Sequence, residues 1–283
     1  MDARTVTTQI RGGIGNQLFI YAMVRRLSLA NGVRLILETK SGFDGDFFRR
    51  TYGLNVFKIA GQEVSAPRRP QWSRRAAIGA NALLPFSRRW YFRESSGSFD
   101  LRFLDLKVVR PVYLEGYWQD ERYFADIRAQ LKQDLTFVKP HTEANEALAH
   151  QMRNSESVAV HVRQLDVAFL PAEYYRIAIQ HMKERLPGVS FYLFCDNPEL
   201  AAIPGVEQEM LRVGNTGEQA QYEDLYLMSQ CRHYVLANST FSWWGAWLGR
   251  KQESIVVTPV MHEWNQRARI PDEWHAIEWR HRS

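Results

Sequence analysis

The second half of this chain alternates between short apolar runs and segments whose apolar residues recur at helical spacing. The apolar runs cover 157–162, 189–195, 234–237 and 254–258, and the helical segments cover 172–185, 218–232 and 241–248. Strands that alternate with helices over short connections form a parallel sheet with helices on both of its faces. The pattern therefore predicts a doubly wound α/β domain.

The first half begins with one similar unit. Residues 5–10 have the pattern of a strand, Gly12 to Gly15 form a glycine-rich turn, and 16–30 has helical spacing that ends at Asn31-Gly32. A strand is expected at 33–37, another at 112–115, and a helix at 123–135. The stretch 40–110 predicts loops and short helices, and 137–154 a connector. We expect two domains, 1–140 and 141–283, because a chain of 283 residues is long for one core.

Several classes of protein are disfavoured by simple features of the sequence. The N-terminus lacks the apolar segment of a signal peptide, and no run of about 18 apolar residues suits a membrane span. The two cysteines, Cys195 and Cys231, indicate neither a disulfide framework nor a structural zinc site. The natural location for such a chain is the reducing cytoplasm.

A basic stretch lies between residues 67 and 93. It holds no acidic residue and interleaves arginines with aromatic side chains; the arginines are Arg68, Arg69, Arg74, Arg75, Arg88, Arg89 and Arg93. Such a patch suits nucleic acid, an anionic membrane surface or a polyanionic substrate, and it also suits a solvated face without any partner. No DNA- or RNA-binding motif accompanies it, so we do not expect nucleic acid as the partner.

The segment 233–248 combines a strand with the start of an aromatic helix. After the strand come Asn238, Ser239 and Thr240, and the helix that they open carries three tryptophans. The first turn of a helix has unpaired backbone N–H groups and a partial positive charge, so small polar residues there can cradle a phosphate. The same residues also suit an ordinary cap on a buried helix.

Two further polar groups follow strands of the second domain. Arg163 follows 157–162, with Asp166 close behind, and Asp196 follows 189–195. Open α/β sheets bind ligands at the carboxyl ends of their strands. An arginine suits a diphosphate, and a carboxylate can accept two hydrogen bonds from guanine. Arg163 can equally pair with Asp166, and Asp196 can cap a helix before Pro198.

The chain resembles the α-1,2-fucosyltransferases, glycosyltransferase family 11, in five segments that occur in the order that family shows. They are Gly12-Gly13-Ile14-Gly15-Asn16-Gln17-Leu18-Phe19 with Tyr21-Ala22, Gly116-Tyr117-Trp118-Gln119, His161-Val162-Arg163 with Asp166, Asp224-Leu225 with Met228-Ser229 and Cys231, and Asn238-Ser239-Thr240-Phe241-Ser242-Trp243-Trp244-Gly245-Ala246-Trp247-Leu248.

This resemblance implies a B-type glycosyltransferase architecture, in which two Rossmann-like doubly wound domains face a cleft. The N-terminal domain would take the acceptor and the C-terminal domain the GDP-sugar. The implied reaction is the inverting, metal-independent transfer of L-fucose from GDP-fucose to the 2-hydroxyl of a galactose-containing glycan. If that glycan is lipid-linked, the basic stretch Arg68–Arg93 would contact the anionic inner membrane, with the protein peripheral to it.

The resemblance also implies roles for individual residues. Arg163 would neutralise the leaving β-phosphate, and Asp196 would hold guanine. Asp166 is the candidate general base, with Asp120 and Glu121 in reserve, and Asn16 would bond to the sugar or the acceptor. The expected donor-binding set is Gly13, Gly15, His161, Arg163, Asp196, Asn238, Ser239, Thr240, Phe241 and Ser242, with phosphate oxygens held by Ser239, Thr240 and Ser242.

One departure from the family pattern keeps a second hypothesis open. Gln164-Leu165 stands where the family commonly has Arg-Gly. The loss of that arginine favours either an altered donor affinity or a catalytically impaired homologue that binds nucleotide or glycan without transfer.

The glycine-rich turn supports a rival function, that of an NAD-dependent oxidoreductase. Gly13 and Gly15 begin a dinucleotide-like fingerprint, and Glu38 ends the next strand. Leu18, however, occupies the third glycine position, where close helix–strand packing requires the absence of a side chain.

Asp44-Gly45-Asp46 matches the Asp-x-Asp motif with which other glycosyltransferases hold a metal. It lies in a loop and does not end an apolar strand, so a turn is the simpler interpretation. We expect no metal and no separate cofactor, since Arg163 and the helix start can carry the phosphate charge.

Overall fold

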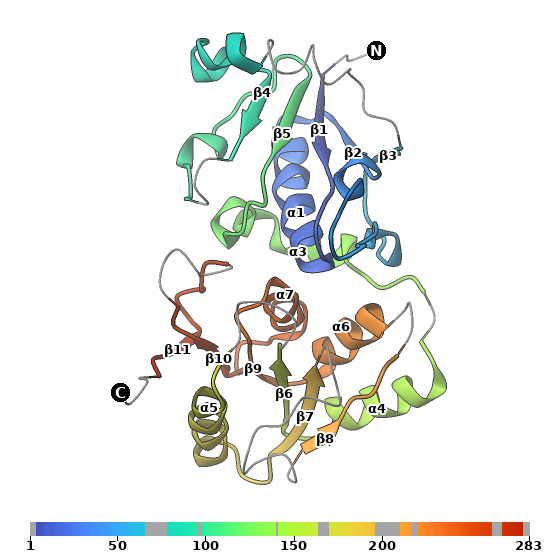
Figure 1. The fold of residues 1–283 in the computed structure, drawn as a ribbon, viewed down its shortest axis with the longest axis vertical. Coiled ribbons are helices and arrows are strands. Elements are labelled where there is room, and N and C mark those ends of the chain that lie inside the picture. Colours follow the sequence, from blue (N-terminus) through green and yellow to red (C-terminus); the bar gives the residue numbers. More distant parts are fainter. Residues whose placement is uncertain are drawn as a thin grey trace. The chain divides into compact units, whose positions relative to one another are not determined.

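The computed structural model describes residues 4–65, 78–94, 98–139, 141–163, 170–195, 210–216, 220–261 and 268–279. The chain forms two compact units, Met1–Val138 and Lys139–Ser283. Each unit contains its own parallel sheet (Figure 1). Among the described residues, no helix combines the length and the apolar character that a membrane crossing requires.

The first unit is built on a five-stranded sheet of order β3-β2-β1-β5-β4, in which every neighbouring pair is parallel. Its strands are β1 (Thr5–Gln9), β2 (Arg34–Glu38), β3 (Gln62–Val64), β4 (Tyr91–Arg93) and β5 (Val112–Glu115), and its α-helices are α1 (Ile14–Asn31) and α3 (Arg128–Asp134). Short 3-10 helices cover Ser41–Phe43, Leu54–Val56, Phe86–Arg88, Leu101–Phe103, Glu121–Tyr123 and Ala125–Ile127.

Helix α1 connects β1 to β2 and packs against both strands (Figure 1). Gly12 precedes the helix at φ +76° and Gly32 ends it at φ +59°, and both values fall in the left-handed region that glycine adopts most easily. The helix begins at Ile14, two residues before the expected start, so Gly15 and Asn16 belong to its first turn.

The second unit is built on a six-stranded sheet of order β11-β10-β9-β6-β7-β8, again with all neighbours parallel. Its strands are β6 (Ser157–Val162), β7 (Ser190–Cys195), β8 (Met210–Arg212), β9 (His233–Val235), β10 (Val256–Pro259) and β11 (His275–Ile277). Its helices are α4 (Glu143–Arg153), α5 (Ala172–Arg185), α6 (Ala220–Gln230) and α7 (Thr240–Gly249).

Helices cover both faces of this sheet, with α5 on one side and α4 and α6 on the other (Figure 1). The buried cluster under α5 joins residues such as Tyr174, Ile179 and Met182 to Val160 of β6 and Leu193 of β7. Both units are thus parallel α/β sheets of the Rossmann type, and the expected fold class is confirmed.

The structure differs from the expected elements at the sheet edges and after β5. Strands β3, β4, β8 and β11 were not expected, because three residues are too few to show a period. The single helix expected over 123–135 is instead two 3-10 turns followed by α3. Phe124 has φ −142°, which is incompatible with a helix and separates the turns.

Candidate functional site

The second sheet has its topological switch point between β6 and β9. In chain order β7 and β8 add to one side of β6, whereas β9, β10 and β11 add to the other. Ligands of open α/β sheets bind outside the carboxyl ends of the strands at this reversal. Arg163 directly follows β6, and the Asn238-Ser239-Thr240 segment leads from β9 into the first residue of α7, so both lie at the switch point.

A ring contact brings the ends of these two strands together. Val160 of β6 pairs with Val235 of β9, and the chain then continues to His161 on one strand and to α7 on the other. The imidazole of His161 and the ring of Phe241 lie with centroids 5.5 Å apart. The arginine segment and the helix start, predicted separately from the sequence, are therefore neighbours in the fold.

The start of α7 is a capped helix terminus. Ser239 is the N-cap, with extended backbone, and its hydroxyl accepts a hydrogen bond from the Phe241 N–H at 3.3 Å. Ser242 is fully buried and its hydroxyl donates to the carbonyls of Ala237 and Ser239, at 3.4 and 3.2 Å. Asn238 is buried as well, whereas Thr240 and Phe241 are half-buried. In this conformation the hydroxyls of Ser239 and Ser242 bond to the backbone at the start of the helix, and Thr240 carries the more accessible hydroxyl.

The tryptophans of α7 fix the position of that helix start. Trp244 and Trp247 are fully buried and pack edge to face at 4.9 Å, and the indole N–H of Trp243 donates to the Arg269 carbonyl at 3.1 Å. At the other end of α7, a Cβ on Gly249 would lie 2.2 Å from the Ser229 carbonyl oxygen. Only glycine permits this close approach of α6 and α7, and the aromatic packing holds the N-terminus of α7 in place.

His161 is a buried, neutral side chain at the centre of the site. Burial, and to a lesser extent the charge of Arg163, lower the pKa of its imidazole to about 3. Its Nδ1 is buried and makes no hydrogen bond within the described residues. A buried polar atom without a partner is costly, so a ligand that bonds to it would remove a penalty of about 1 to 3 kcal/mol.

Some of the expected site residues lie outside the described residues. They are Asp166, the candidate base, Asp196, the candidate guanine ligand, and the Gln164-Leu165 departure. Cys195, the residue before Asp196, ends β7, which is the neighbour of β6 in the sheet.

Asp224 is a titratable group that the expected site set did not include. It lies in the first turns of α6, and burial raises the pKa of its carboxyl to about 7 although Asn215 donates to it at 2.8 Å. Asp224 lies in one of the segments that carry the family resemblance, so the resemblance could have identified it as a candidate site residue. Strongly perturbed pKa values concentrate at functional sites.

The first sheet has its own switch point, between β1 and β5, and two of the family segments meet there. Asn16 lies in the first turn of α1 and Gln119 follows β5, and the Gln119 side-chain N–H donates to the side-chain oxygen of Asn16 at 2.8 Å. Gly13 is the N-cap of α1, and Gly15 is buried in its first turn. Gln17 connects the surrounding loops by hydrogen bonds. Its side-chain N–H groups donate to the Gly12 and Thr51 carbonyls, and its side-chain oxygen accepts from the Gly53 N–H.

The two carboxylates held in reserve as general bases are engaged in ion pairs. Both oxygens of the buried Asp120 accept from the Arg122 guanidinium, at 3.0 Å for Nε and 2.5 Å for Nη2. Glu121 accepts from Arg128 at 3.0 Å. Asp120 also caps the following 3-10 turn, so its geometry is that of a structural residue.

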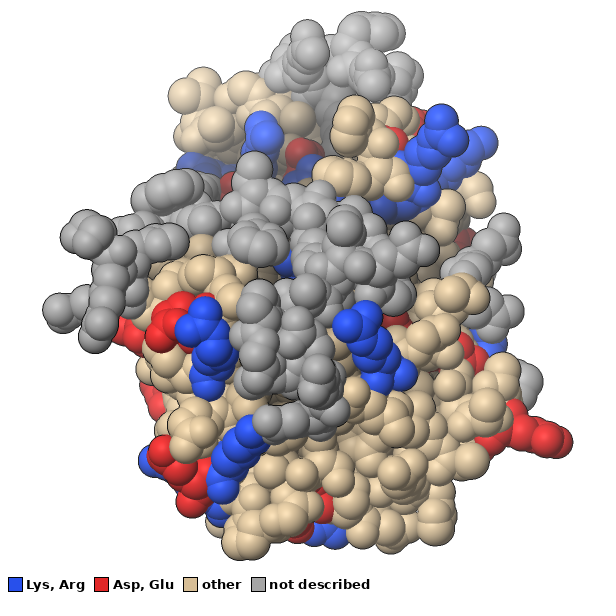
Figure 2. All heavy atoms as spheres, turned by 60° about the horizontal axis from the view of Figure 1, so that its bottom comes forward, with Lys and Arg blue, Asp and Glu red and all other residues tan. Residues whose placement is uncertain are grey.

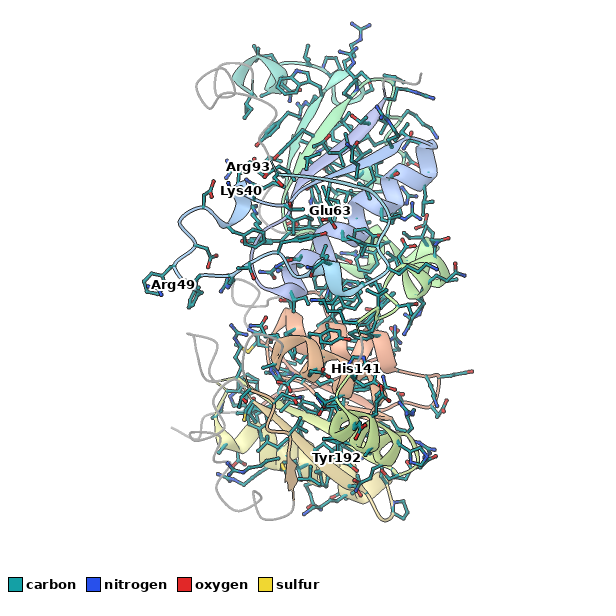
Figure 3. The ribbon with its side chains drawn as sticks, turned by 90° about the vertical axis from the view of Figure 1, so that its right-hand side faces the viewer. Lys40, Arg49, Glu63, Arg93, His141 and Tyr192 are labelled. Carbon is teal, nitrogen blue, oxygen red and sulfur yellow. The ribbon has the colours of Figure 1, made fainter. Side chains whose placement is uncertain are left out.

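The Asp44-Gly45-Asp46 segment forms a turn. One Asp46 oxygen accepts from the backbone N–H groups of Phe48 and Arg50, at 2.9 and 3.2 Å, and Gly45 has φ +74°. Arg49, at φ +52°, projects from this loop (Figure 3). In the described part of the chain, no three His, Cys, Asp or Glu side chains gather in the manner of a metal site.

The described part of the basic stretch contains Arg88, Arg89 and Arg93, and Arg68 to Arg75 lie outside it. Arg89 donates to the Leu84 and Ala82 carbonyls, at 2.9 and 3.0 Å, so it supports its own loop. On the face drawn in Figure 2, the described Lys and Arg side chains are dispersed, and Asp or Glu lies beside several of them.

Comparison with known protein families gives a match over most of the chain. The sequence profile of "Glycosyl transferase family 11" matches residues 86–282. This range includes the β5 segment of the first unit and nearly all of the second unit.

Two curated bacterial proteins are similar over nearly their full lengths. An α-1,2-colitosyltransferase of Escherichia coli is 27% identical over 303 aligned positions, which cover 96% of this chain and 99% of that protein. The O-antigen biosynthesis glycosyltransferase WbnK of Escherichia coli is 26% identical, with 94% and 98% covered.

Solved structures of fucosyltransferases share the fold. Fucosyltransferase NodZ from Bradyrhizobium has a TM-score of 0.56 at 14% identity, with 87% of this chain and 92% of that chain covered. Arabidopsis thaliana FUT1, as the R284K mutant in complex with GDP, has a TM-score of 0.53 at 12% identity, with 90% and 70% covered.

Proposed function

Because this chain belongs to glycosyl transferase family 11, we propose that it transfers a 6-deoxyhexose from a GDP-sugar to the 2-hydroxyl of a galactoside. The acceptor would be a galactose-containing glycan, and the linkage formed would be α-1,2. Membership of a glycosyltransferase family leaves the NAD-dependent oxidoreductase hypothesis without support, and Leu18 fills the position that a dinucleotide turn keeps empty.

The observation that carries this proposal is the ring contact between the neutral His161 and Phe241, which brings the end of β6, just before Arg163, to the start of α7 at the switch point of the second sheet. A guanidinium and a helix N-terminus both stabilise a phosphate oxyanion. His161 adds no charge, so the site can accept the negative diphosphate with Arg163 as its cation. In this proposal the second unit holds the GDP-sugar and the first unit the acceptor.

The reaction is a displacement at the anomeric carbon with inversion. The acceptor 2-hydroxyl oxygen forms a bond to that carbon, the bond to the β-phosphate oxygen breaks, and GDP leaves with the electron pair. Arg163 and the N–H groups of α7 stabilise the charge that grows on the β-phosphate. The acceptor proton passes to a general base, for which Asp166 remains our candidate. With these groups the transfer would need no metal.

Two donors fit the proposal, GDP-fucose and GDP-colitose, and they differ in the 3-hydroxyl that colitose lacks. L-Fucose is what the family resemblance implies, whereas one relative is a colitosyltransferase. A site that hydrogen-bonds the 3-hydroxyl would reject colitose strongly, because its own polar groups would be left unpaired.

The test is a screen of both donors against galactose-terminated acceptors, followed by linkage analysis of every product. Transfer to the 2-hydroxyl of a β-galactoside supports the proposal, and a product linked elsewhere contradicts the assigned position. Nucleotide binding without turnover of either donor would instead favour the impaired homologue that Gln164-Leu165 suggests.

The cellular setting follows from the acceptor. The relative WbnK acts in O-antigen biosynthesis, so a lipid-linked surface glycan is our proposed acceptor. We propose a cytoplasmic enzyme that is peripheral to the inner membrane, with contact through the basic stretch Arg68–Arg93. Association with vesicles that contain anionic phospholipid, lost at high salt, tests this contact.

A further inference from the structure

We propose that the switch point of the first sheet is a binding subsite for a neutral pyranoside, centred on the ring of Tyr117 and bordered by Arg11, Glu115, Asn16 and Gln119. The identification of that pyranoside as the galactoside acceptor rests on the proposed function. The subsite itself is argued from the first unit alone.

The segment after β5 presents three polar side chains at a spacing of two residues. Glu115, Tyr117 and Gln119 are partly exposed, whereas Leu114, Gly116 and Trp118 between them are buried. The alternation of buried and partly exposed residues thus continues beyond the end of the strand, although the backbone is no longer extended at Trp118. It supplies a carboxylate, an aromatic ring and an amide at the carboxyl edge of the sheet.

The turn after β1 lies against these side chains. The Arg11 guanidinium stacks over the Tyr117 ring, with Cζ 4.7 Å from the ring centroid, and one of its nitrogens lies 3.7 Å from a Glu115 oxygen. In the first turn of α1, which follows, the Asn16 side chain accepts the hydrogen bond from Gln119 at 2.8 Å. Glu115 also accepts from the Tyr91 hydroxyl at 2.5 Å, and Arg93 of β4 lies 4.0 Å from it (Figure 3).

The backbone that carries Tyr117 is held rigidly. The two carboxylate oxygens of Glu94 accept from the N–H groups of Tyr117 and Trp118, at 2.6 and 3.0 Å. Gly116 is required there, because a Cβ would lie 2.5 Å from the Glu94 Cβ.

The buried side chain of Trp118 also holds this turn in place. It adopts a left-handed backbone, φ +55°, and its fully buried indole packs edge to face on Phe103 and Tyr123, at 4.8 and 5.5 Å. A strained non-glycine residue costs about 1 to 3 kcal/mol and persists where the surrounding structure over-determines it, most often at functional sites.

The chemistry of these side chains matches a sugar and not an anion. A pyranose has an apolar face of C–H groups, which packs on an aromatic ring, and a rim of hydroxyls. Planar carboxylate, amide and guanidinium groups bond such hydroxyls in pairs, as donors or acceptors. The carboxylates of Glu115 and Glu94 balance the guanidinium groups of Arg11 and Arg93, so these four side chains carry no net charge.

The experiment separates acceptor binding from donor chemistry. Three variants are assayed in the full chain: Tyr117→Ala, Tyr117→Phe and Leu83→Ala. Leu83→Ala is the control, because it removes an exposed apolar side chain elsewhere in the unit. For each protein the transfer to lactose and the hydrolysis of the GDP-sugar by water are measured separately. Tyr117→Ala should raise the acceptor KM about 10-fold or more, leave donor hydrolysis unchanged and leave the shift of Tm with GDP unchanged. Leu83→Ala should stay within about 2-fold of the wild type, and Tyr117→Phe, which keeps the aromatic ring, should recover most of the acceptor affinity that Tyr117→Ala loses.

An unchanged acceptor KM in Tyr117→Ala overturns the subsite, whatever the reaction catalysed. A second readout needs no turnover: saturation-transfer NMR with methyl β-galactoside should give a signal in the wild type and in Tyr117→Phe that is lost in Tyr117→Ala. If this pattern appears in a protein that transfers neither donor, the proposed function fails and the subsite stands. The absence of any galactoside signal in the wild type contradicts the subsite.

Discussion

The rings of His161 and Phe241 face one another at 5.5 Å with an interplanar angle of 40°. His161 is the second-last residue of β6, and Phe241 belongs to the first turn of α7. Arg163 follows His161 by two residues, so this contact brings the end of β6, just before Arg163, to the backbone N–H groups at the start of α7. A substitution of Arg163 and a comparison of nucleotides can test whether a ligand binds at the start of α7.

Arg163→Ala should nearly abolish transfer, by about 10²-fold or more, because the charge on the departing β-phosphate loses its cation. The circular dichroism spectrum and the Tm should stay close to those of the wild type. Arg185→Ala, which removes an exposed arginine at the end of α5, is the control and should retain activity. Activity above about a tenth of the wild type in Arg163→Ala would remove Arg163 from its assigned role.

GDP should raise the Tm far more than UDP, ADP or NAD at the same concentration, since a ligand that binds only the folded state stabilises it more the more tightly it binds. The physical reason is the guanine contact that we assign to Asp196, and Asp196→Asn should reduce the advantage of GDP over ADP. Equal shifts with all four nucleotides would refute the base contact.

Transfer should persist in EDTA, because in the proposed function Arg163 and α7 stabilise the charge that a metal would otherwise balance. The carboxylate of Asp46 is already bonded to backbone N–H groups and lies 3.8 Å from the Arg50 guanidinium. Activity that disappears in EDTA and returns with manganese would instead favour the metal interpretation of Asp44-Gly45-Asp46.

The buried imidazole of His161 should make the protein less stable as the pH is lowered. The pKa of His161 is about 3 in the folded chain, against about 6.5 in an unfolded one. Below about pH 6.5 the unfolded state binds a proton that the native state does not, so the free energy of unfolding falls. The expected loss between pH 7.5 and pH 5 is about 2 kcal/mol. Urea unfolding of the wild type and of His161→Gln measures it, with the exposed His150→Gln as the control. The same pH slope in wild type and His161→Gln would contradict the assignment.

Asp224 should make the protein less stable as the pH is raised, which is opposite to the effect of His161. Burial raises the pKa of its carboxyl to about 7, whereas the unfolded value is about 3.9. Between these values the native state binds the extra proton, so the stability contributed by this group is lost as the pH rises from about 4 to about 7. Asp224→Asn should therefore gain stability relative to the wild type as the pH is raised. A stability difference between the two proteins that does not change with pH would rule out the raised pKa.

Much of the fold could be predicted from the sequence because its signals are local. The runs at 157–162 and 172–185 coincide with β6 and α5, since an apolar strand and a helix with a Pro-Gly stop each show their period within their own residues. The edge strands β8 and β11 could not be predicted, because three-residue strands are defined only by the neighbour to which they bond.

The candidate site, like the fold, could be predicted from the sequence only where its features are local. A strand that runs into Asn238-Ser239-Thr240 and an apolar helix indicates a phosphate cradle without any knowledge of the remaining chain. The sequence does not reveal that Ser242 is fully buried with its hydroxyl bonded to carbonyls, or that Asp120 is paired with Arg122. Burial and hydrogen-bond partners depend on which segments pack together.

The amino-acid sequence alone determined that this protein consists of parallel α/β units and that Arg163 and Asn238-Ser239-Thr240 follow strands, because each of these properties depends on neighbouring residues. The tertiary structure decided which strand ends are adjacent. It placed β6 beside β9, and it brought Asn16 within 2.8 Å of Gln119, which lies 103 residues further along the chain. The order of strands in a sheet results from long-range pairing and packing, for which a single sequence carries no local signal.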